Sequence, residues 1–203
     1  MPESIRRPAT YEDLCRVPDH LLAQIVDGEL ITQPRPTIAH QHAASVLSFD
    51  LGNPFDRGRG GPGGWWILYE PELHLCHDIL VPDLAGWRRD HVPELPGGAF
   101  LTIAPDWICE VLSPSTASLD RVRKLRIYAR EGVAHAWLVD PTARTLEVLR
   151  RDGERWILVS THAGDETVRA EPFDAIELDL TALWLTPSPP EPIVAESMAP
   201  LTP

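Results

Sequence analysis

The sequence predicts an α/β fold, of the α+β or mixed α/β kind, from three observations. From Trp65 onward the side chains alternate with a period of two, which is typical of strands. The run DWICEVL at 106–112 is short and almost wholly apolar, as expected of a central strand covered on both faces. Residues 118–131 repeat apolar side chains at helical spacing instead. Strands and helices are therefore both expected.

The N-terminal part is expected to hold a short helix and a hairpin. The helix spans 10–20, with Thr10 as N-cap and Asp13 as the acid of a capping box, and a proline ends it. The β-prone runs of 21–34 lie on either side of Asp27-Gly28, which is the strongest two-residue hairpin signal. The chain thus starts with helix, strand and strand.

A second helix and two strands are expected next. The helix covers 37–51 and stops at Gly52-Asn53-Pro54, and the glycine-rich stretch 57–64 forms a flexible loop. The alternating runs 65–75 and 79–87 are each expected to form one strand, joined by a turn. The strand 106–112 follows after a connection rich in proline and glycine.

The helix at 118–131 is expected to turn Val122, Leu125 and Ala129 inward and to end at Gly132. Three further strands follow it, joined by the turns DPTAR and RDGE, at 135–140, 145–151 and 155–161. Residues 1–185 are expected to form one domain. The proline-rich stretch 186–203 is expected to be a tail without a packed core.

Composition limits the possible functions. The 203 residues carry a net charge of −12, and the sequence pI is about 5.0. Such acidity argues against unspecific attraction to polyphosphates, so nucleic-acid binding would need a local cationic surface or metal ions. The three cysteines form no CxxC pair and indicate reduced thiols. No apolar run is long enough to span a membrane, and the expected location is the cytoplasm.

Two carboxylates stand in apolar surroundings. Glu110 lies between Cys109 and Val111, and Asp83 lies between Pro82 and Leu84. An unpaired buried carboxylate costs several kcal/mol, so each needs a cation, a metal or a hydrogen-bonding cage. One interpretation is a shared divalent metal. The other is that Glu110 pairs with an arginine, or that either acid lies at a solvated strand end.

Lys124 favours the first interpretation. It is the only lysine in a chain whose other 17 cations are arginines. A lysine on the helix after 106–112 could reach back over the strand end to Glu110. Its compact ammonium can serve as a point charge or proton donor beside an attacking water. The alternative is a lysine left by chance on an exposed helix face.

Four motifs resemble one known family. They are IVDGELITQPRPTIAHQHAA, VPDLAGW, PDWICEVLSPST and DRVRKLRIYAREGVAHAWLVDP, in this order over about residues 10–150. This set resembles the restriction endonuclease family known as Uma-two, within the PD-(D/E)XK nuclease superfamily. The resemblance implies a restriction-endonuclease-like core, a mixed sheet flanked by helices. It also implies metal-dependent hydrolysis of nucleic-acid phosphodiesters.

The resemblance assigns roles residue by residue. Asp83 matches the Asp of the PD element and Glu110 the acid of the (D/E)XK element. Leu112 stands where the superfamily has its lysine, and Lys124 matches the lysine moved to the next helix. The supporting positions are Glu72 (or, less favoured, Glu70), His40, Gln24 (a frequent glutamate in the family) and Glu29 as its substitute. Helix spacing, and not the resemblance, adds Tyr128: it lies one turn beyond Lys124 on the same face, where it either lines the cleft or packs the helix.

The implied chemistry uses Mg²⁺ or Mn²⁺ held by Asp83 and Glu110, with Lys124 stabilising the developing charge. The expected partner is nucleic acid, in the first place DNA, and no membrane association is expected. Homodimerisation is also expected. The cationic contacts to nucleic acid are expected from Arg88, Arg89, Arg121, Arg123, Arg126 and Arg130. The alternative, favoured by the net charge and by Gln24, is a nuclease-fold protein without turnover that works as a binding or regulatory partner.

Overall fold

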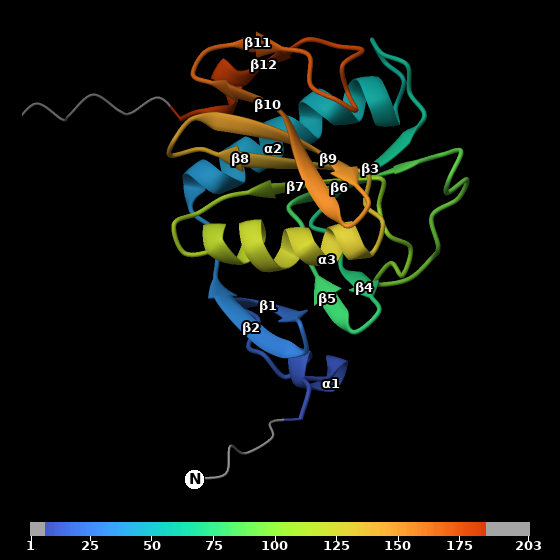
Figure 1. The fold of residues 1–203 in the computed structure, drawn as a ribbon, viewed down its shortest axis with the longest axis vertical. Helices are drawn as coiled ribbons and strands as arrows, with labels where there is room; N and C mark the ends of the chain where they lie inside the picture. Colours follow the sequence, from blue (N-terminus) through green and yellow to red (C-terminus); the bar gives the residue numbers. More distant parts are fainter. Residues whose placement is uncertain (1–6, 186–203) are drawn as a thin grey trace, which may run out of the picture.

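A mixed six-stranded sheet forms the centre of the computed structural model, which describes residues 7–185 (Figure 1). The strand order is β10-β9-β8-β7-β6-β3. Only β7 and β8 pair in parallel within this sheet. The bounds are β3 Trp65–Tyr69, β6 Leu84–Arg88, β7 Trp107–Val111, β8 His135–Asp140, β9 Thr145–Asp152 and β10 Arg155–Ala163. The predicted α/β class with a mixed sheet is confirmed, and the central strand β7 is buried along its whole length.

A second, four-stranded sheet has the order β2-β1-β5-β4. Its first hairpin is the predicted one, with Asp27 at φ 53° and Gly28 at φ 75°, the left-handed conformations that a two-residue hairpin turn needs. The bounds are β1 Leu21–Val26, β2 Glu29–Pro34, β4 Leu73–Leu75 and β5 Asp78–Leu80.

The expectation of two unbroken strands at 65–75 and 79–87 is wrong. Each run divides between the two sheets, so that β3 and β6 pair in the large sheet while β4 and β5 pair in the small one. Pro71 and Pro82 lie at the breaks, where they cannot donate a ladder hydrogen bond. Glu70 takes a positive φ of 44°, and its N–H bonds to the Asp83 carbonyl at 3.0 Å. The bend thereby places two acidic residues side by side.

The α-helix α2, Ile38–Leu51, ends before Gly52 as predicted, and Thr37 is its N-cap. Helical structure does not stop there, however. The chain continues as a π-helical segment, η1, over Gly52–Asp56. The Arg57 N–H bonds to the Gly52 carbonyl five residues earlier, at 3.0 Å. This wider turn accommodates Pro54, whose ring would clash with the preceding turn of a regular α-helix.

The predicted helix at 118–131 is present, but it starts as a π-helix. The π-helical η2 spans Leu119–Lys124 and α3 spans Leu125–Arg130. Leu125 and Ala129 are buried as expected, whereas Val122 is 62% exposed, so its inward placement is wrong. The π-helical segment changes the angle between successive residues, and it turns Lys124 toward the interior instead.

Each face of the large sheet has its own core (Figure 1). One face packs against α2 together with β11 (Thr167–Val168), β12 (Leu178–Asp179) and η3 (Leu180–Leu183). The opposite face packs against α3 and the small sheet. The sheet therefore separates two hydrophobic layers, and the small sheet lies on the layer of α3.

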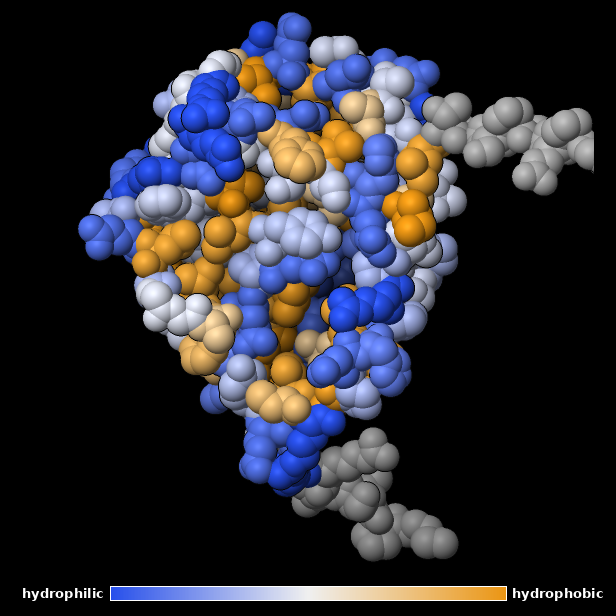
Figure 2. All heavy atoms as spheres, turned by 180° about the vertical axis from the view of Figure 1, so that it is seen from behind, coloured by the Kyte–Doolittle hydropathy of each residue, from blue (hydrophilic) through white to orange (hydrophobic). Residues whose placement is uncertain are grey.

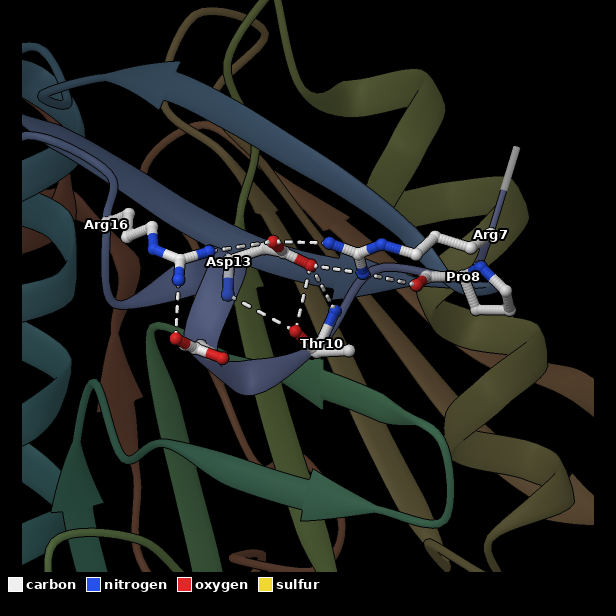
Figure 3. A network of polar contacts seen from close by, with 6 residues as sticks. Arg7, Pro8, Thr10, Asp13 and Arg16 are labelled. Atoms are coloured by element: carbon white, nitrogen blue, oxygen red, sulfur yellow. Dashed lines mark hydrogen bonds and ion pairs between the residues drawn. The ribbon is translucent and has the colours of Figure 1, made fainter.

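The first helix, α1 (Tyr11–Leu14), has the predicted capping box, although it ends earlier than predicted. Thr10 Oγ1 accepts the Asp13 N–H, and the Asp13 carboxylate accepts the Thr10 N–H at 3.0 Å. Figure 3 shows Arg7 reaching the same carboxylate, with its two nitrogens 2.8 and 2.9 Å from the oxygens. The predicted tail at 186–203 lies outside the described residues. Within 7–185 no helix has the length and apolar character to cross a membrane.

Candidate functional site

A cavity of about 270 Å³ lies where the two sheets, α2 and η2 meet. Residues from both halves of the chain line it, including Asp83, Glu110 and Lys124. The sequence prediction that these three side chains converge is therefore confirmed. The rest of the wall includes Leu22, Gln24, Gln33, Arg35, Thr37, His40, Glu70, Val81, Val111, Ser113, Ser115, Thr116 and Asp120.

Lys124 lies in a buried cluster with two acids and a phenol. Its Nζ is 2.7 Å from Glu110 Oε1 and 3.3 Å from Asp120 Oδ1. The hydroxyl of Tyr128 donates to the same Glu110 oxygen at 2.7 Å. The side chains of Lys124 and Glu110 are each only 2% exposed. The lone lysine is thus held at the bottom of the cavity beside the acid of β7.

The second acid, Asp83, is fixed from two sides. Its Oδ2 accepts the Val111 N–H at 2.6 Å, so the carboxylate is tied to the end of β7. Its Oδ1 lies 3.2 Å from Nε2 of His40, which comes from the first turn of α2. The Nδ1 atom of His40 is buried and has no hydrogen-bonding partner within residues 7–185. His40, which the resemblance gave as a supporting residue, lies in the cavity wall and orients Asp83.

The structure separates the other supporting residues into two groups. Gln24 lines the cavity, and its side-chain oxygen accepts the Val81 N–H at 2.9 Å. Glu72 and Glu29 do not line it: Glu72 binds His74 at 2.7 Å, and Glu29 binds Arg123 at 2.9 Å. Glu70, the less favoured of the two strand acids, does line the cavity.

The carboxylates of the cavity outnumber its cations, and this excess of negative charge shifts the pKa values of its side chains. Burial, with Asp120 and Asp83 nearby, raises the pKa of Glu110 to about 8 against the opposing effect of Lys124. Burial alone would lower the pKa of Lys124, but Glu110 and Asp120 outweigh it and raise that pKa. Burial alone would also lower the pKa of His40, but the neighbouring Asp83 carboxylate outweighs burial and raises that pKa. The pKa values of Glu110, Lys124 and His40 are thus all raised, as expected where several carboxylates are buried together.

The donor atoms suit a hard divalent cation. Mg²⁺ takes carboxylate oxygens, and it commonly uses one or two carboxylates and completes its shell with waters and substrate phosphates. Asp83 and Glu110 could supply that pair, and the surplus negative charge would favour it. Within 7–185 no three His, Cys, Asp or Glu side chains form a complete ligand set. The cavity therefore fits a cation held partly by substrate and solvent and does not fit a closed structural metal site.

The arginines expected to contact nucleic acid are occupied by carboxylates. Their partners, in ion pairs of 2.7–3.1 Å, are Asp90 for Arg88, Asp56 for Arg89, Glu147 for Arg121, Asp27 and Glu29 for Arg123, Asp27 for Arg126, and Asp78 and Glu131 for Arg130. Arg89 also stacks on the Trp66 ring at 3.6 Å. The expected cationic surface is therefore largely neutralised.

Two functional candidates were missed from the sequence. Asp120 is buried against Lys124, and an acid four residues before a lysine was the available signal for it. Arg35 lies in the cavity wall between two prolines of the β2–α2 connection. Nothing in the local sequence distinguishes Arg35 from the other arginines.

Comparison with known proteins identifies a family and a similar fold. The sequence model of the Uma2 family, described as "Putative restriction endonuclease", matches residues 8–182. The chain belongs to the Uma2 family. A crystal structure of "a putative nuclease belonging to DUF820" from Anabaena variabilis ATCC 29413 has a similar fold, with a TM-score of 0.68 and 21% identity. The match covers 87% of this chain and 97% of that one. None of the curated proteins matches.

Proposed function

We propose that this Uma2 protein is a metal-dependent endonuclease that hydrolyses phosphodiester bonds of nucleic acid, with DNA as the expected substrate. One observation carries the proposal. Asp83 precedes β6, Glu110 lies in β7 and Lys124 in η2, and the three meet at one cavity, with Lys124 Nζ 2.7 Å from Glu110. Burying a lysine together with several acids lowers the stability of the fold, so stability alone does not account for this cluster. Perturbed buried charges in a cavity are a common mark of a catalytic site.

The chain's own residues have distinct tasks in this proposal. Asp83 and Glu110 would hold Mg²⁺ or Mn²⁺, which when bound supplies Lewis-acid activation of water and phosphoryl oxygen. Lys124 keeps a positive charge beside the place where charge develops on the pentacovalent phosphorus. Asp120 and Tyr128 orient Lys124 and Glu110, and His40 orients Asp83.

Lys124 also explains the departure from the superfamily motif. Leu112, at the usual lysine position, is 2% exposed and packs in the core of the α3 layer. The ammonium of Lys124 approaches Glu110 from η2 instead. A charge supplied from the helix can occupy the same place as one supplied from the strand.

A second function, a nuclease-fold binding protein without turnover, has observations in its favour. Glu110 Oε1 is already engaged by Lys124 and Tyr128. The described residues also offer no complete set of metal ligands. Divalent-ion uptake and turnover together separate the two functions, because a binding protein of this kind needs neither.

The deciding experiment is a metal-titrated cleavage assay on a mixed panel of DNA and RNA. We expect cleavage with Mg²⁺ or Mn²⁺ and a loss of about 10²–10³-fold in Lys124→Met, as for other groups that stabilise transition-state charge. Asp83→Asn should lose both cleavage and calorimetric uptake of the ion. Asp90→Asn removes an exposed acid outside the cavity and serves as the matched control.

Equal cleavage by wild type, Asp83→Asn and Lys124→Met would reveal a contaminating nuclease and contradict the proposal. Uptake without cleavage would favour the binding protein. The cytoplasmic location and the homodimer expected from the sequence stay predictions. Sedimentation velocity would test the dimer.

A further inference from the structure

The reactive groups of this protein lie in a small, recessed space. Glu110 and Lys124 are buried, and only about 270 Å³ is open beside them. That volume is near the lower end of the range of about 300–1,000 Å³ for small-ligand pockets. A phosphodiester must therefore enter the cavity to reach Asp83 and Glu110. A paired and stacked nucleotide of a rigid duplex cannot do so without leaving its helix.

The exterior is also poorly suited to a long duplex. Duplex binding gains most of its affinity when free Lys and Arg displace counterions from several phosphates. Here the arginines of η2, α3 and the end of β6 bind carboxylates of the same chain. On the opposite side of the molecule, Figure 2 shows hydrophilic residues in separate groups, interrupted by hydrophobic ones. The net charge of −12 adds long-range repulsion.

Arg35, in the cavity wall, differs from these paired arginines. Arg35 is exposed, and it has no acidic partner within residues 7–185. Its Nη2 donates to the Asp19 carbonyl at 2.8 Å. An arginine has five N–H donors, so this bond leaves most of the guanidinium available. Pro34 and Pro36 on either side restrict the backbone, which limits the entropy lost when Arg35 binds a ligand.

Hydroxyl groups from the β7–η2 loop also line the cavity. Ser113 Oγ lies 3.0 Å from Ser115 Oγ and 3.0 Å from Thr116 Oγ1. These neutral groups can hydrogen-bond phosphate or sugar oxygens without adding charge. The wall thus combines a free guanidinium with neutral donors, and the acids and Lys124 lie farther inside.

We propose that the cavity accepts an unpaired nucleotide of a single-stranded nucleic acid, with Arg35 binding a phosphate of that strand. The proposal rests on the proposed nuclease function and specifies its substrate class. A single strand is narrow enough to thread one nucleotide into the recess, and the unpaired state removes the cost of opening a duplex. Arg35 is a substrate-positioning residue, and Asp83, Glu110 and Lys124 are the groups at the scissile bond.

The test compares a single strand, a hairpin with an unpaired loop, and a blunt duplex of the same sequence. Binding is measured by fluorescence anisotropy of the labelled strands in EDTA, and cleavage is measured with Mg²⁺ or Mn²⁺. We expect binding and cleavage of the single strand and the loop, with the duplex at least about tenfold weaker, since opening a pair costs a few kcal/mol. A few phosphate contacts should also give a shallow salt dependence, about −0.7 in log–log slope for each phosphate.

Arg35→Ala should weaken single-strand binding and raise KM by about tenfold, the loss expected for a hydrogen bond to a charged group, while kcat changes little. Arg35→Lys should restore part of the affinity. Arg155→Ala is the matched control, because Arg155 is exposed, lies outside the cavity wall and lacks an acidic partner within the described chain. It should behave as wild type.

The outcomes separate this proposal from the one it rests on. A duplex bound and cleaved as well as the single strand would overturn the substrate class. Arg35→Ala equal to Arg155→Ala would overturn the role of Arg35. Either result leaves the nuclease intact. Arg35-dependent binding of single strands without cleavage of any substrate would instead remove the nuclease and retain the strand site. Failure to bind any strand in EDTA, together with failure to cleave any strand with Mg²⁺ or Mn²⁺, would remove both.

Discussion

The two sides of the helix formed by η2 and α3 carry ion pairs of equal length in opposite surroundings. On the buried side Lys124 Nζ lies 2.7 Å from Glu110 Oε1, and both side chains are 2% exposed. On the outer side Arg121 Nη1 lies 2.7 Å from Glu147 Oε2, with exposures of 37% and 23%. The contacts look alike, but solvent screens the outer pair and is excluded from the inner one.

The comparison shows why distance alone does not rank these pairs. An exposed pair contributes about 0–1 kcal/mol because water competes for both charges. Removing one partner of a buried pair costs about 3–5 kcal/mol because the remaining charge stays unpaired. The outer pairs neutralise the surface, whereas the inner cluster retains excess negative charge. The candidate site therefore lies on the side of the helix where the negative charge is not fully neutralised.

The largest expected effect comes from breaking the two pairs separately. Lys124→Met keeps a side chain of similar length but leaves Glu110 and Asp120 without their cation. We expect the free energy of unfolding to fall by about 3–5 kcal/mol, against about 0–1 kcal/mol for Arg121→Met. Chemical denaturation at pH 7.5 in EDTA measures both.

A double variant separates lost charge from lost packing. Glu110→Gln in the Lys124→Met background removes one of the unpaired acids and should recover part of the stability. Equal losses in Lys124→Met and Arg121→Met would contradict the contrast between the two sides. No recovery in the double variant would mean that packing of the lysine chain, and not its charge, stabilises this region.

A smaller effect is expected from pH. Because the pKa of Glu110 rises from 4.5 to about 8 on folding, the folded protein holds a proton that the unfolded chain has lost between these values. Stability in EDTA should therefore fall as pH rises toward 8, by at most about 1.4 kcal/mol per pH unit from one proton. His40, whose pKa is also raised, contributes with the same sign. Denaturation midpoints from pH 6.5 to 8 would show the slope.

Two variants test the source of that slope. Glu110→Gln should flatten it. Arg88 lowers the pKa of Asp90 from 3.8, so the stability that this carboxylate contributes is lost only when pH falls below that value. Asp90→Asn should thus keep the wild-type slope between pH 6.5 and 8. A flat wild-type curve would mean that Glu110 is fully ionised in the folded protein.

The inner side of the helix was more predictable from sequence than the outer side. Glu110 in an apolar run and a lone lysine are local anomalies, and a carboxylate buried in such a run needs a partner whatever the fold. The partners of the arginines, in contrast, lie far away in the chain, as with Arg121 and Glu147 or Arg123 and Asp27. Pairing between distant elements cannot be derived from residue types alone.

The errors in the fold have local physical causes. The strand at 65–75 alternates correctly, but Pro71 interrupts its ladder and turns Glu70 toward the cavity in place of Glu72. A period of 3.6 places Val122 in the core, whereas the π-helical segment turns it outward. Periodicity predicts elements well while their hydrogen bonding stays regular, and it fails where a bend or a π turn shifts the phase.

The smallest expected effect concerns only the buried side of the helix formed by η2 and α3. Tyr128→Phe removes the hydroxyl that donates to Glu110 Oε1 at 2.7 Å and leaves the ring packed in the core. We expect a loss of about 0.5–1.5 kcal/mol in unfolding free energy. Because that hydrogen bond favours the ionised carboxylate, its loss should also raise the pKa of Glu110 and extend the pH slope above 8. In a Glu110→Gln background the extension should vanish; additive effects of the two substitutions would show that the phenol does not act through Glu110.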